Sequence, residues 1–348
     1  MKVLITHELF PPDIIGGGER LTYKIAKELI NRGFQVKVLT SGDPKIRWYE
    51  NIETIRLPIN RYLMNFSYPF IKKHSKDVDL IHTSSGNMCF PSYLAAKSNK
   101  KPICCYIHHI FGRYWVYVRG QILGRVFQIA EKIFLTRDYD AVIFQNYQSM
   151  KIGLELGIKK ERIFMIHPGI DWKEYDMDVE KKRQVLFVGS LSMDRSLAKI
   201  KGLNCFIEAA RLIPGVDFLV VGDVKNMQEK NIPKNVIFIG SKGKEELKRI
   251  YNESLVFCKP SITEGFSLTL LEAMASGCAI VSTIDIGQKG KIVKPENPLE
   301  LADAIKHYLD NPVLAKKDGM ENKKLAKKFT WKRFIDDLIK IYEYITSR

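Results

Sequence analysis

Short hydrophobic runs alternate with amphipathic segments of helical length along almost the whole chain. The runs are five to eight residues long and rich in β-branched residues, which predicts buried strands. The segments between them repeat apolar residues every three or four positions, which predicts helices. Strands that alternate with helices in this way indicate parallel sheets covered by helices on both faces.

The predicted strands of the first half cover residues 2–6, 35–40, 52–57, 80–84, 103–108, 141–145 and 163–167. Those of the second half cover residues 184–191, 217–223, 236–240, 255–261 and 279–283. The clearest predicted helices cover residues 18–32, 203–213, 244–252, 268–276 and 298–310. A strong helical stripe also runs through residues 329–347.

A polar stretch, residues 167–184, separates two halves that each begin with a strand followed by glycine. A chain of 348 residues is too long for one core and suits two domains of about 150 residues. We therefore place a first doubly wound domain at residues 1–168 and a second at residues 169–330. Residues 331–348 form a last helix that we expect to pack back on the first domain. Two such domains bind ligands in a cleft at the carboxyl ends of their strands.

The composition is that of a globular protein, with 45% hydrophobic and 27% charged residues. No apolar run reaches the roughly 18 residues that a membrane-spanning helix needs. The start of the sequence lacks the long apolar segment of a signal peptide, so we expect a cytoplasmic protein. The six cysteines are scattered through apolar runs without metal-type spacing, which predicts buried free thiols in a reducing compartment.

Positive charge is concentrated in the first half of the chain, whose formal net charge as a whole is +16. Residues 1–170 contain 25 lysines and arginines against 14 acids, and the remaining residues contain 30 against 25. Between Leu80 and Arg137 a single acid, Glu131, accompanies eight bases. Such a field favours a polyanion, an anionic membrane surface or a phosphate-bearing substrate.

The most informative stretch is SITEGFSLTLLEAMASG, which contains Glu264 and Glu272. It follows a predicted buried strand and is expected to form a loop and then a helix that ends at Gly277. Glu264 then lies where the loop meets the helix, at the carboxyl edge of a sheet. The first backbone amides of a helix are a ready binding site for phosphate. Here these amides belong to Phe266, Ser267, Leu268 and Thr269.

Helix capping accounts tolerably for Glu264, because a carboxylate near a helix N-terminus offsets the macrodipole. It accounts less well for Glu272, which lies in an otherwise apolar helix where an unpaired carboxylate is costly. The vicinal hydroxyls of a ribose would pair with such a carboxylate, so the stretch as a whole suits a nucleotide sugar. A glycosidase pair fits poorly, since eight helical residues span about 12 Å and such carboxyl pairs need roughly 5–9.5 Å.

The E-x7-E spacing within EGFSLTLLEAMASG resembles the signature of retaining GT-B glycosyltransferases of the GT4 type. Three further segments are similar to that family in the same order along the chain: HELFPPDIIGGGERLTYKIAKELINRGFQVKVLT, KERIFMIHPGID and KGLNCFIEAARLIPGVDFLVVGD. The resemblance covers nearly the whole chain and implies the GT-B fold, in which two Rossmann-like domains face a central cleft. It implies acceptor binding by the first domain, donor binding by the second, a UDP- or GDP-linked sugar as donor, and no cofactor or metal ion.

The same resemblance implies roles for the residues that match the family's motifs. His108 is expected to face the transferred sugar, Lys201 to counter the donor's phosphate charge, and Glu264 to orient the sugar ring, so these three are the expected catalytic residues. The other expected donor-binding residues are Gly17, Gly18, Arg195, Phe266, Ser267, Leu268, Thr269 and Glu272. The expected acceptor-binding residues are Gly16, Ser85 and Asn87.

The glycine loop at residues 16–18 is not a G-x-G-x-x-G sequence, which disfavours a dinucleotide-binding oxidoreductase. Glycine there would let backbone approach a ligand closely, although a simple turn also explains it. Ser190 departs from the family, which often has arginine at this point, so Arg195 or Lys199 would have to replace that contact. The short loop IDIGQKGKIV replaces the family's Gly-Gly-x-Pro-Glu loop. The DYD sequence at residues 138–140 follows a predicted helix, and we expect no metal site there.

Residues 111–137 interleave bases with aromatic and aliphatic residues. A helix of this composition would lie on an anionic membrane with its apolar face down and Arg113, Arg119 and Arg125 at the headgroups. A core-facing helix with a basic outer face explains the same pattern. Nucleic acid is not an expected partner, because no recognised binding motif accompanies these bases.

The sequence thus predicts a retaining glycosyltransferase that moves a sugar from a nucleotide sugar to a sugar, a glycan or a lipid-linked acceptor. The basic segment adds the expectation of peripheral attachment to the inner face of a membrane. Two alternatives remain. One keeps the fold and is a nucleotide-sugar 2-epimerase, and the other is a basic, non-catalytic module that binds a membrane or nucleic acid.

Overall fold

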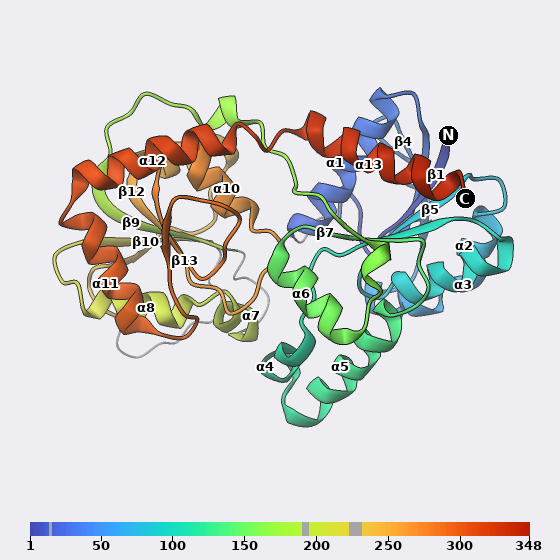
Figure 1. Cartoon of the computed structure of the whole chain (residues 1–348), viewed down its shortest axis with the longest axis horizontal. Helices are drawn as coiled ribbons and strands as arrows, with labels where there is room; N and C mark the ends of the chain where they lie inside the picture. The colour runs from blue at the N-terminus through green and yellow to red at the C-terminus, as the bar shows by residue number, and fades with distance from the viewer. Residues whose placement is uncertain (14–15, 190–194, 223–231) are drawn as a thin grey trace. The chain divides into compact units, whose positions relative to one another are not determined.

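The chain forms two compact units in the computed structural model (Figure 1). The structure describes residues 1–13, 16–189, 195–222 and 232–348, with the side chains of residues 195–197 outside this description. Unit 1 consists of Met1–Trp115, Arg125–Pro168 and Lys332–Arg348, and unit 2 of Val116–Gly124 and Gly169–Trp331.

In the described part of unit 1, eight strands form a sheet in the order β3-β4-β2-β1-β5-β6-β7-β8. Neighbouring strands are parallel except for β3 and β4, which are antiparallel. The strands are β1 (Lys2–Thr6), β2 (Gln35–Ser41), β3 (Trp48–Tyr49), β4 (Ile52–Leu57), β5 (Leu80–Ser84), β6 (Ile103–Tyr106), β7 (Ala141–Phe144) and β8 (Ile163–Met165). The parallel order brings the carboxyl ends of β1, β5, β6 and β7 to one edge.

Helices cover both faces of the unit 1 sheet (Figure 1). One face is covered by α1 (Gly17–Asn31) and α13 (Trp331–Thr346). The other face packs on α2 (Tyr68–His74), α3 (Cys89–Asn99), the end of α5 (Gln121–Leu135) and α6 (Tyr147–Leu156). The short helix α4 (Trp115–Arg119) precedes α5.

Adjacent cysteines on β6 illustrate how the sheet separates its two faces. Cys105 belongs to the core on the α3 face, whereas Cys104 Sγ lies 3.6 Å from His82 Nδ1. His82 Nδ1 in turn shares a 2.6 Å hydrogen bond with Tyr342 Oη of α13. The two thiols therefore point to opposite faces of the sheet, as successive side chains of a strand do. All six cysteines are free, and all but the half-buried Cys205 are buried.

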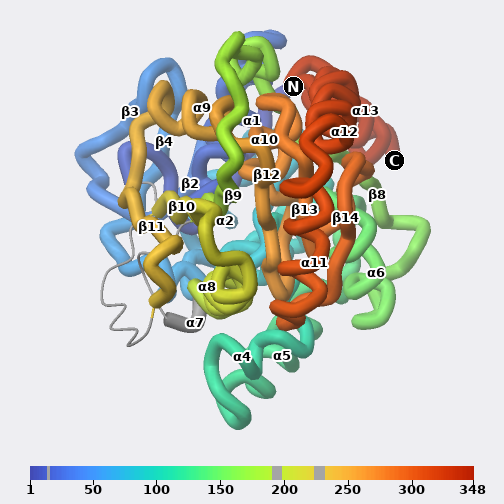
Figure 2. Tube along the Cα trace, turned by 90° about the vertical axis from the view of Figure 1, so that its left-hand side faces the viewer, coloured from blue at the N-terminus to red at the C-terminus, as the bar shows by residue number. Residues whose placement is uncertain are grey.

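In the described part of unit 2, six parallel strands form a sheet in the order β11-β10-β9-β12-β13-β14 (Figure 2). The strands are β9 (Lys182–Val188), β10 (Asp217–Val221), β11 (Val236–Phe238), β12 (Ser254–Lys259), β13 (Ala279–Ser282) and β14 (Gly290–Ile292). The helices are α7 (Arg195–Ile200), α8 (Leu203–Arg211), α9 (Lys244–Glu253), α10 (Leu268–Ala275), α11 (Pro298–Leu309) and α12 (Pro312–Ala326).

Alternation along β9 creates two separate cores in unit 2. Val185 and Phe187 pack with α8 and α11 on one face, while Leu186 and Val188 pack with α9 and α10 on the other. A strand buried on both faces needs apolar residues at every position, which is why its sequence shows no polar alternation.

The structure confirms the predicted parallel α/β architecture of both halves. Most predicted strands are longer than the observed ones, and β6 ends at Tyr106 rather than at residue 108. Strands β3 and β14 were not predicted, because two or three residues are too short for a period to be recognised. Within the described ranges, no helix is long and apolar enough to cross a membrane.

Candidate active site

The carboxyl edge of the unit 2 sheet brings a carboxylate and two lysines together. Glu264 lies in the loop between β12 and α10 and is only 7% exposed. Its Oε1 accepts hydrogen bonds from Lys201 Nζ at 2.7 Å and from Ser261 Oγ at 3.2 Å. The same oxygen lies 3.0 Å from Lys259 Nζ. The structure thus places the predicted residues Lys201 and Glu264 in direct contact.

A glycine makes the contact between Lys201 and Glu264 possible. Gly202 has a φ of +78° and forms the N-cap of α8. A Cβ at this position would lie 1.9 Å from the carbonyl oxygen of Pro260. Only glycine allows this backbone approach, and the approach sets Lys201 beside the loop that carries Glu264.

Lys259 is the site residue that sequence reasoning missed. It is the last residue of the buried strand β12, and its side chain is 3% exposed. Burial lowers the pKa of its ammonium group, and the charge of Glu264 opposes that shift. The sequence did contain a signal for Lys259, because this lysine ends the otherwise apolar run LVFCK. A lysine at a buried position is rarely without a partner, so a nearby carboxylate could have been expected.

Helix α10 begins directly after Glu264 and presents its N-terminus at the same edge. Ser267, in the left-handed region with a φ of +62°, caps the helix through its Oγ, which accepts a hydrogen bond from the amide of Leu270. The amides of Leu268 and Thr269 lie in the first turn, where helix geometry supplies no partner. Phe266 has a buried side chain, so it contributes a wall and a backbone amide. A helix start of this kind favours an anion.

Glu272 has two protein partners that the sequence did not suggest. Tyr175 Oη, from the 3-10 helix η4 (Trp172–Tyr175), donates to Oε1 at 3.0 Å, and Tyr251 Oη of α9 donates to Oε2 at 2.8 Å. Burial, followed by the charge of Glu272, raises the pKa of both phenols. They therefore remain donors, and the two hydroxyls account for a carboxylate in an apolar helix. Its predicted contact with a ribose stays a prediction.

Two sequence positions of the donor site fall outside what the structure describes. Ser190, where the sequence departs from the family pattern, lies outside the described residues. Arg195 begins α7, but its side chain is outside the description. Its role also stays a prediction.

At the carboxyl edge of the unit 1 sheet, His108 lies two residues beyond β6. Its backbone amide donates to Ser85 Oγ at 3.2 Å, and its Nε2 lies 3.2 Å from Ser84 Oγ. Its ring packs edge-on against the ring of His7, with centroids 5.2 Å apart. Burial, followed by the charges of His7 and His82, holds the pKa of His108 well below its usual value. His108 is therefore a neutral imidazole at physiological pH.

The predicted acceptor residue Asn87 belongs to a hydrogen-bonded network with residues that the sequence did not single out, whereas Ser85 Oγ accepts the amide of His108 and donates to the carbonyl oxygen of His109 at 3.5 Å. The amide of Asn87 donates to Glu8 Oε1 at 2.8 Å, and its side chain accepts from Asn65 Nδ2 at 2.8 Å. Glu8 Oε2 also receives both Nε and Nη2 of Arg61, at 3.1 and 2.7 Å. A bidentate pair of this kind fixes the carboxylate. The signal for Glu8 was its position two residues past a predicted strand.

The glycine loop leads into α1 at the same edge. Gly16 is the N-cap, and its amide donates to Glu19 Oε2 at 2.8 Å. A Cβ on Gly18 would lie 3.5 Å from His7 Nε2, whereas a Cβ on Gly17 would meet nothing within 4 Å. The fold itself therefore does not require glycine at Gly17. Close approach of a ligand remains the predicted reason for it.

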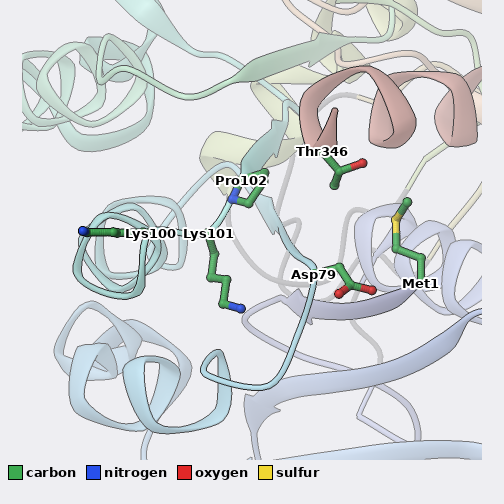
Figure 3. Close-up of a pocket in the computed structure, with 6 residues that line it drawn as sticks. All are labelled: Met1, Asp79, Lys100, Lys101, Pro102 and Thr346. Carbon is green, nitrogen blue, oxygen red and sulfur yellow. The ribbon is translucent and has the colours of Figure 1, made fainter. Parts of the chain in front are cut away.

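Neither the DYD sequence at residues 138–140 nor the cavity in Figure 3 contributes to these two groups of residues. Asp138 of the DYD sequence pairs with Arg162 and Lys159, at 3.3 and 3.4 Å, and Asp140 accepts the amide of Ile103. No cluster of three or more metal-ligating side chains occurs among the described residues. The cavity in Figure 3, with a volume of about 400 Å³, lies at the amino-terminal edge of the unit 1 sheet, away from these polar groups. It is lined by Met1, Asp79, Lys100, Lys101, Pro102 and Thr346.

Comparison with known proteins agrees with this geometry. The family model Glycosyltransferase Family 4 matches residues 15–174, and the model Glycosyl transferases group 1 matches residues 182–311. A glycosyltransferase of Methanocaldococcus jannaschii named MJ1178 is 25% identical, over 100% of this chain and 99% of the relative. The Escherichia coli UDP-Gal:alpha-D-GlcNAc-diphosphoundecaprenol alpha-1,3-galactosyltransferase is 24% identical, over 82% of this chain and 80% of the relative.

A solved structure shows the same fold. The Anabaena protein HepE in complex with UDP-glucose superposes with a TM-score of 0.76 over 100% of both chains, at 16% identity. Two parallel α/β units of this fold, together with the two family matches, define a glycosyltransferase of GT-B fold. The chain belongs to the glycosyltransferases of group 1 and family 4. Its first half matches the family 4 model and its second half matches the group 1 model.

Proposed function

We propose that the chain transfers a sugar from a nucleotide sugar to an acceptor hydroxyl, with retention of anomeric configuration. The observation that carries this proposal is the contact of Lys201 with Glu264 at the start of α10. At this contact, the ammonium of Lys201 and the first amides of α10 can bind a diphosphate, and the carboxylate of Glu264 can bind sugar hydroxyls. Catalysis is then mainly electrostatic stabilisation of the departing diphosphate.

The proposed step breaks the bond between the anomeric carbon and the diphosphate oxygen. The acceptor oxygen bonds to the anomeric carbon from the face that the diphosphate leaves, and the departing diphosphate takes the acceptor's proton. Lys201 and the amides of Leu268 and Thr269 hold the negative charge that develops. Glu264 orients the sugar ring, and the role of His108 toward the transferred sugar stays the one that the family resemblance implies.

Support for the donor comes from the proteins that this chain resembles. HepE was solved with UDP-glucose, and the E. coli relative is named for a UDP-galactose donor. We therefore propose a UDP-sugar as the donor ahead of a GDP-sugar. No metal ion or cofactor takes part in the proposed step, because Lys201 and the helix start supply the positive charge. Full activity after treatment with EDTA is the expected result, and loss of activity that Mg²⁺ or Mn²⁺ restores would contradict it.

A thermal-shift screen against UDP-, GDP- and ADP-sugars identifies the donor. Proton NMR of the product then distinguishes the reactions. A product whose anomeric configuration matches the donor supports retention, and the opposite configuration contradicts it. Acceptor-independent conversion of the donor to an epimer would replace the proposal by the 2-epimerase. Normal cellular function of a Glu264→Ala variant would replace it by a non-catalytic module.

The acceptor side of the proposal rests on helix α5, whose inner face packs on unit 1. Phe134 stacks on Phe90 with ring centroids 4.9 Å apart. Glu131 accepts the amides of Phe111 and Gly112 at 3.1 and 2.7 Å. The single acid of this basic region is therefore turned inward as a structural anchor. The predicted core-facing helix is thus correct for this face.

The outer face of α5 is apolar and not basic, which corrects the alternative drawn from the sequence. Spacings of four, three and four residues place four side chains in one stripe along the helix. These are Ile122, Val126, Ile129 and Ile133, with exposed fractions of 82, 56, 60 and 41%. Arg125 and Lys132 border the stripe on one side. An apolar stripe edged by bases is the pattern of a helix that lies in a membrane interface.

We infer that α5, whose residues up to Gly124 group with unit 2 and the rest with unit 1, holds the protein on an anionic leaflet, where the acceptor is a lipid-linked sugar. The name of the E. coli relative describes such an acceptor, a diphosphoundecaprenol-linked GlcNAc. Full burial of a large apolar side chain contributes about 1.5–3 kcal/mol, whereas a basic residue near the surface contributes about 1 kcal/mol. The isoleucine stripe should therefore dominate binding, and salt should weaken the attachment without abolishing it.

Sedimentation with vesicles of phosphatidylglycerol and phosphatidylcholine tests this. The protein should sediment with anionic vesicles and much less with neutral ones. Changing Ile122, Val126 and Ile129 to serine should release it even in low salt. Changing Arg113, Arg119 and Arg125 to glutamate should weaken binding to anionic vesicles, and this loss should shrink as anionic lipid is removed.

Matched changes on α12 of unit 2 and just beyond its end at Ala326 serve as controls. Val313 is 82% exposed, so Val313→Ser removes an equally exposed apolar side chain, and Lys316, Lys317 and Lys328 supply three bases for the charge change. These controls should bind vesicles as the unmodified protein does. A protein that ignores anionic vesicles at low salt would end the membrane proposal and leave the transferase proposal intact.

A further inference from the structure

Lys259 is a buried ammonium without a direct route to a ligand. Its side chain is 3% exposed, against 23% for Lys201. Both lysines reach the same oxygen of Glu264, at 3.0 and 2.7 Å. Lys201 can therefore leave the carboxylate for a ligand in solvent, whereas Lys259 is held behind it.

The charges of the three groups differ before and after a diphosphate arrives. Before, two ammonium groups share one carboxylate, so these three groups together carry a net charge of one positive, which attracts an anion. A diphosphate then competes with Glu264 for Lys201. If Lys259 were absent, this exchange would cost the buried carboxylate its ion pair with Lys201, which is strongly unfavourable, although Ser261 Oγ would still donate to it. With Lys259 behind it, the carboxylate keeps a partner.

We propose that Lys259 is a positioning residue that keeps Glu264 paired, so that Lys201 can exchange the carboxylate for the donor's diphosphate. The inference rests on the proposed function and deepens it. Lys259 acts only through Glu264 and never touches the donor. Its importance should therefore vanish when the carboxylate is made neutral.

Isothermal titration calorimetry with UDP, and with GDP in parallel, tests this in four proteins: unmodified, Lys259→Met, Glu264→Gln and the double variant. Methionine keeps the length of the side chain and removes the charge. In Lys259→Met, Glu264 retains Lys201, so the dissociation constant for the nucleoside diphosphate should rise at least tenfold. In the double variant the dissociation constant should return to within about threefold of the Glu264→Gln value. The neutral glutamine does not compete with the diphosphate for Lys201, so the loss of Lys259 should no longer matter.

The comparison of the double variant with Glu264→Gln decides the question even if Lys259→Met alone fails to fold. Removing both members of a buried ion pair is tolerated far better than removing one. A double variant that binds at least tenfold more weakly than Glu264→Gln would show that Lys259 acts on the ligand or the fold directly, and would overturn the inference. Unchanged binding by a folded Lys259→Met would also overturn it.

The unmodified protein separates this inference from the function on which it rests. If it binds UDP or GDP and the rescue fails, only the role of Lys259 is wrong. If it binds neither, the proposed donor site fails, and the inference fails with it. Lys259→Arg is a further control, because it keeps the positive charge behind Glu264 and should bind within about threefold of the unmodified protein.

Discussion

At the carboxyl edge of the unit 2 sheet, two lysines share one carboxylate, Glu264. At the corresponding edge of the unit 1 sheet, two imidazoles, His7 and His108, pack edge-on and burial keeps both of their pKa values low. The first arrangement carries excess positive charge beside a helix start, and the second presents neutral rings. The two edges are therefore suited to different ligand groups, a diphosphate at unit 2 and sugar hydroxyls at unit 1.

The charged edge should be the more sensitive one to mutation. Lys201→Ala removes an ammonium that stabilises the departing diphosphate, and loss of one such donor costs about 10²-fold to 10³-fold in kcat. We expect a loss of that size in donor turnover with a smaller rise in KM. Steady-state kinetics with purified variant checks it, and a kcat within about twofold of the unmodified enzyme would remove Lys201 from the mechanism.

A variant of Glu272 shows whether the donor site at the carboxyl edge of the unit 2 sheet extends along α10. Glu272→Ala should weaken binding of the nucleoside diphosphate by about 1–3 kcal/mol, the scale of a lost charged hydrogen bond. Tyr175→Phe, which removes one protein partner and leaves the carboxylate, is the control and should retain binding. Calorimetry with UDP measures both. Unchanged affinity in a folded Glu272→Ala protein would mean that the glutamate serves only Tyr175 and Tyr251.

Acid should affect the two units differently, because all histidines except His307 lie in unit 1. Burial, followed by the charge of His7, lowers the pKa of His82 to about 3. The pKa of histidine in an unfolded chain is about 6.5. Below that pH, the unfolded chain therefore binds a proton at His82 that the folded chain does not bind. Stability from His82 is present above pH 6.5 and is lost as pH falls, by up to about 1.4 kcal/mol per pH unit.

Urea unfolding of the unmodified protein and of His82→Asn, at several values between pH 7 and pH 4, measures that loss. The unfolding free energy of His82→Asn should fall less steeply with acid than that of the unmodified protein. Equal slopes for the unmodified protein and His82→Asn would contradict the assignment of this titration to His82.

The neutral edge should show the smallest effect. His108→Ala removes neutral hydrogen bonds, each of which contributes about 0.5–1.5 kcal/mol. We therefore expect a loss of about tenfold in kcat/KM for the acceptor. The His108→Gln variant, which keeps a polar side chain, should recover part of that loss. A loss as large as that of Lys201→Ala would show that the unit 1 edge also stabilises charge.

The difference between the edges also explains what could be predicted from the sequence. Buried parallel strands leave a strong local pattern, so both sheets were predictable from hydrophobic runs. Lys201 and Glu264 were found because they belong to motifs that resemble a family. Lys259, Tyr175 and Tyr251 were not found, because their contacts join segments that are 5 to 97 residues apart and only the fold brings them together.

On α5 the sequence showed the right composition but left two interpretations, because a helix that is apolar on two faces has no single stripe. Leu135 and Phe134 pack inward, while Ile122 and Ile129 face solvent. Only the packing of Glu131 against the amides of Phe111 and Gly112 shows which face is turned toward the core. His108 was predicted at the end of a strand, and the strand ends two residues earlier.

The central claim is that unit 2 binds the donor's diphosphate and unit 1 does not. Calorimetric titration of UDP into the unmodified protein, Lys201→Ala and His108→Ala tests it most directly, because UDP carries the diphosphate and no sugar. We expect at least a tenfold weaker affinity for Lys201→Ala and an affinity within about twofold of the unmodified protein for His108→Ala. Equal weakening in both variants, or none in Lys201→Ala, would contradict it.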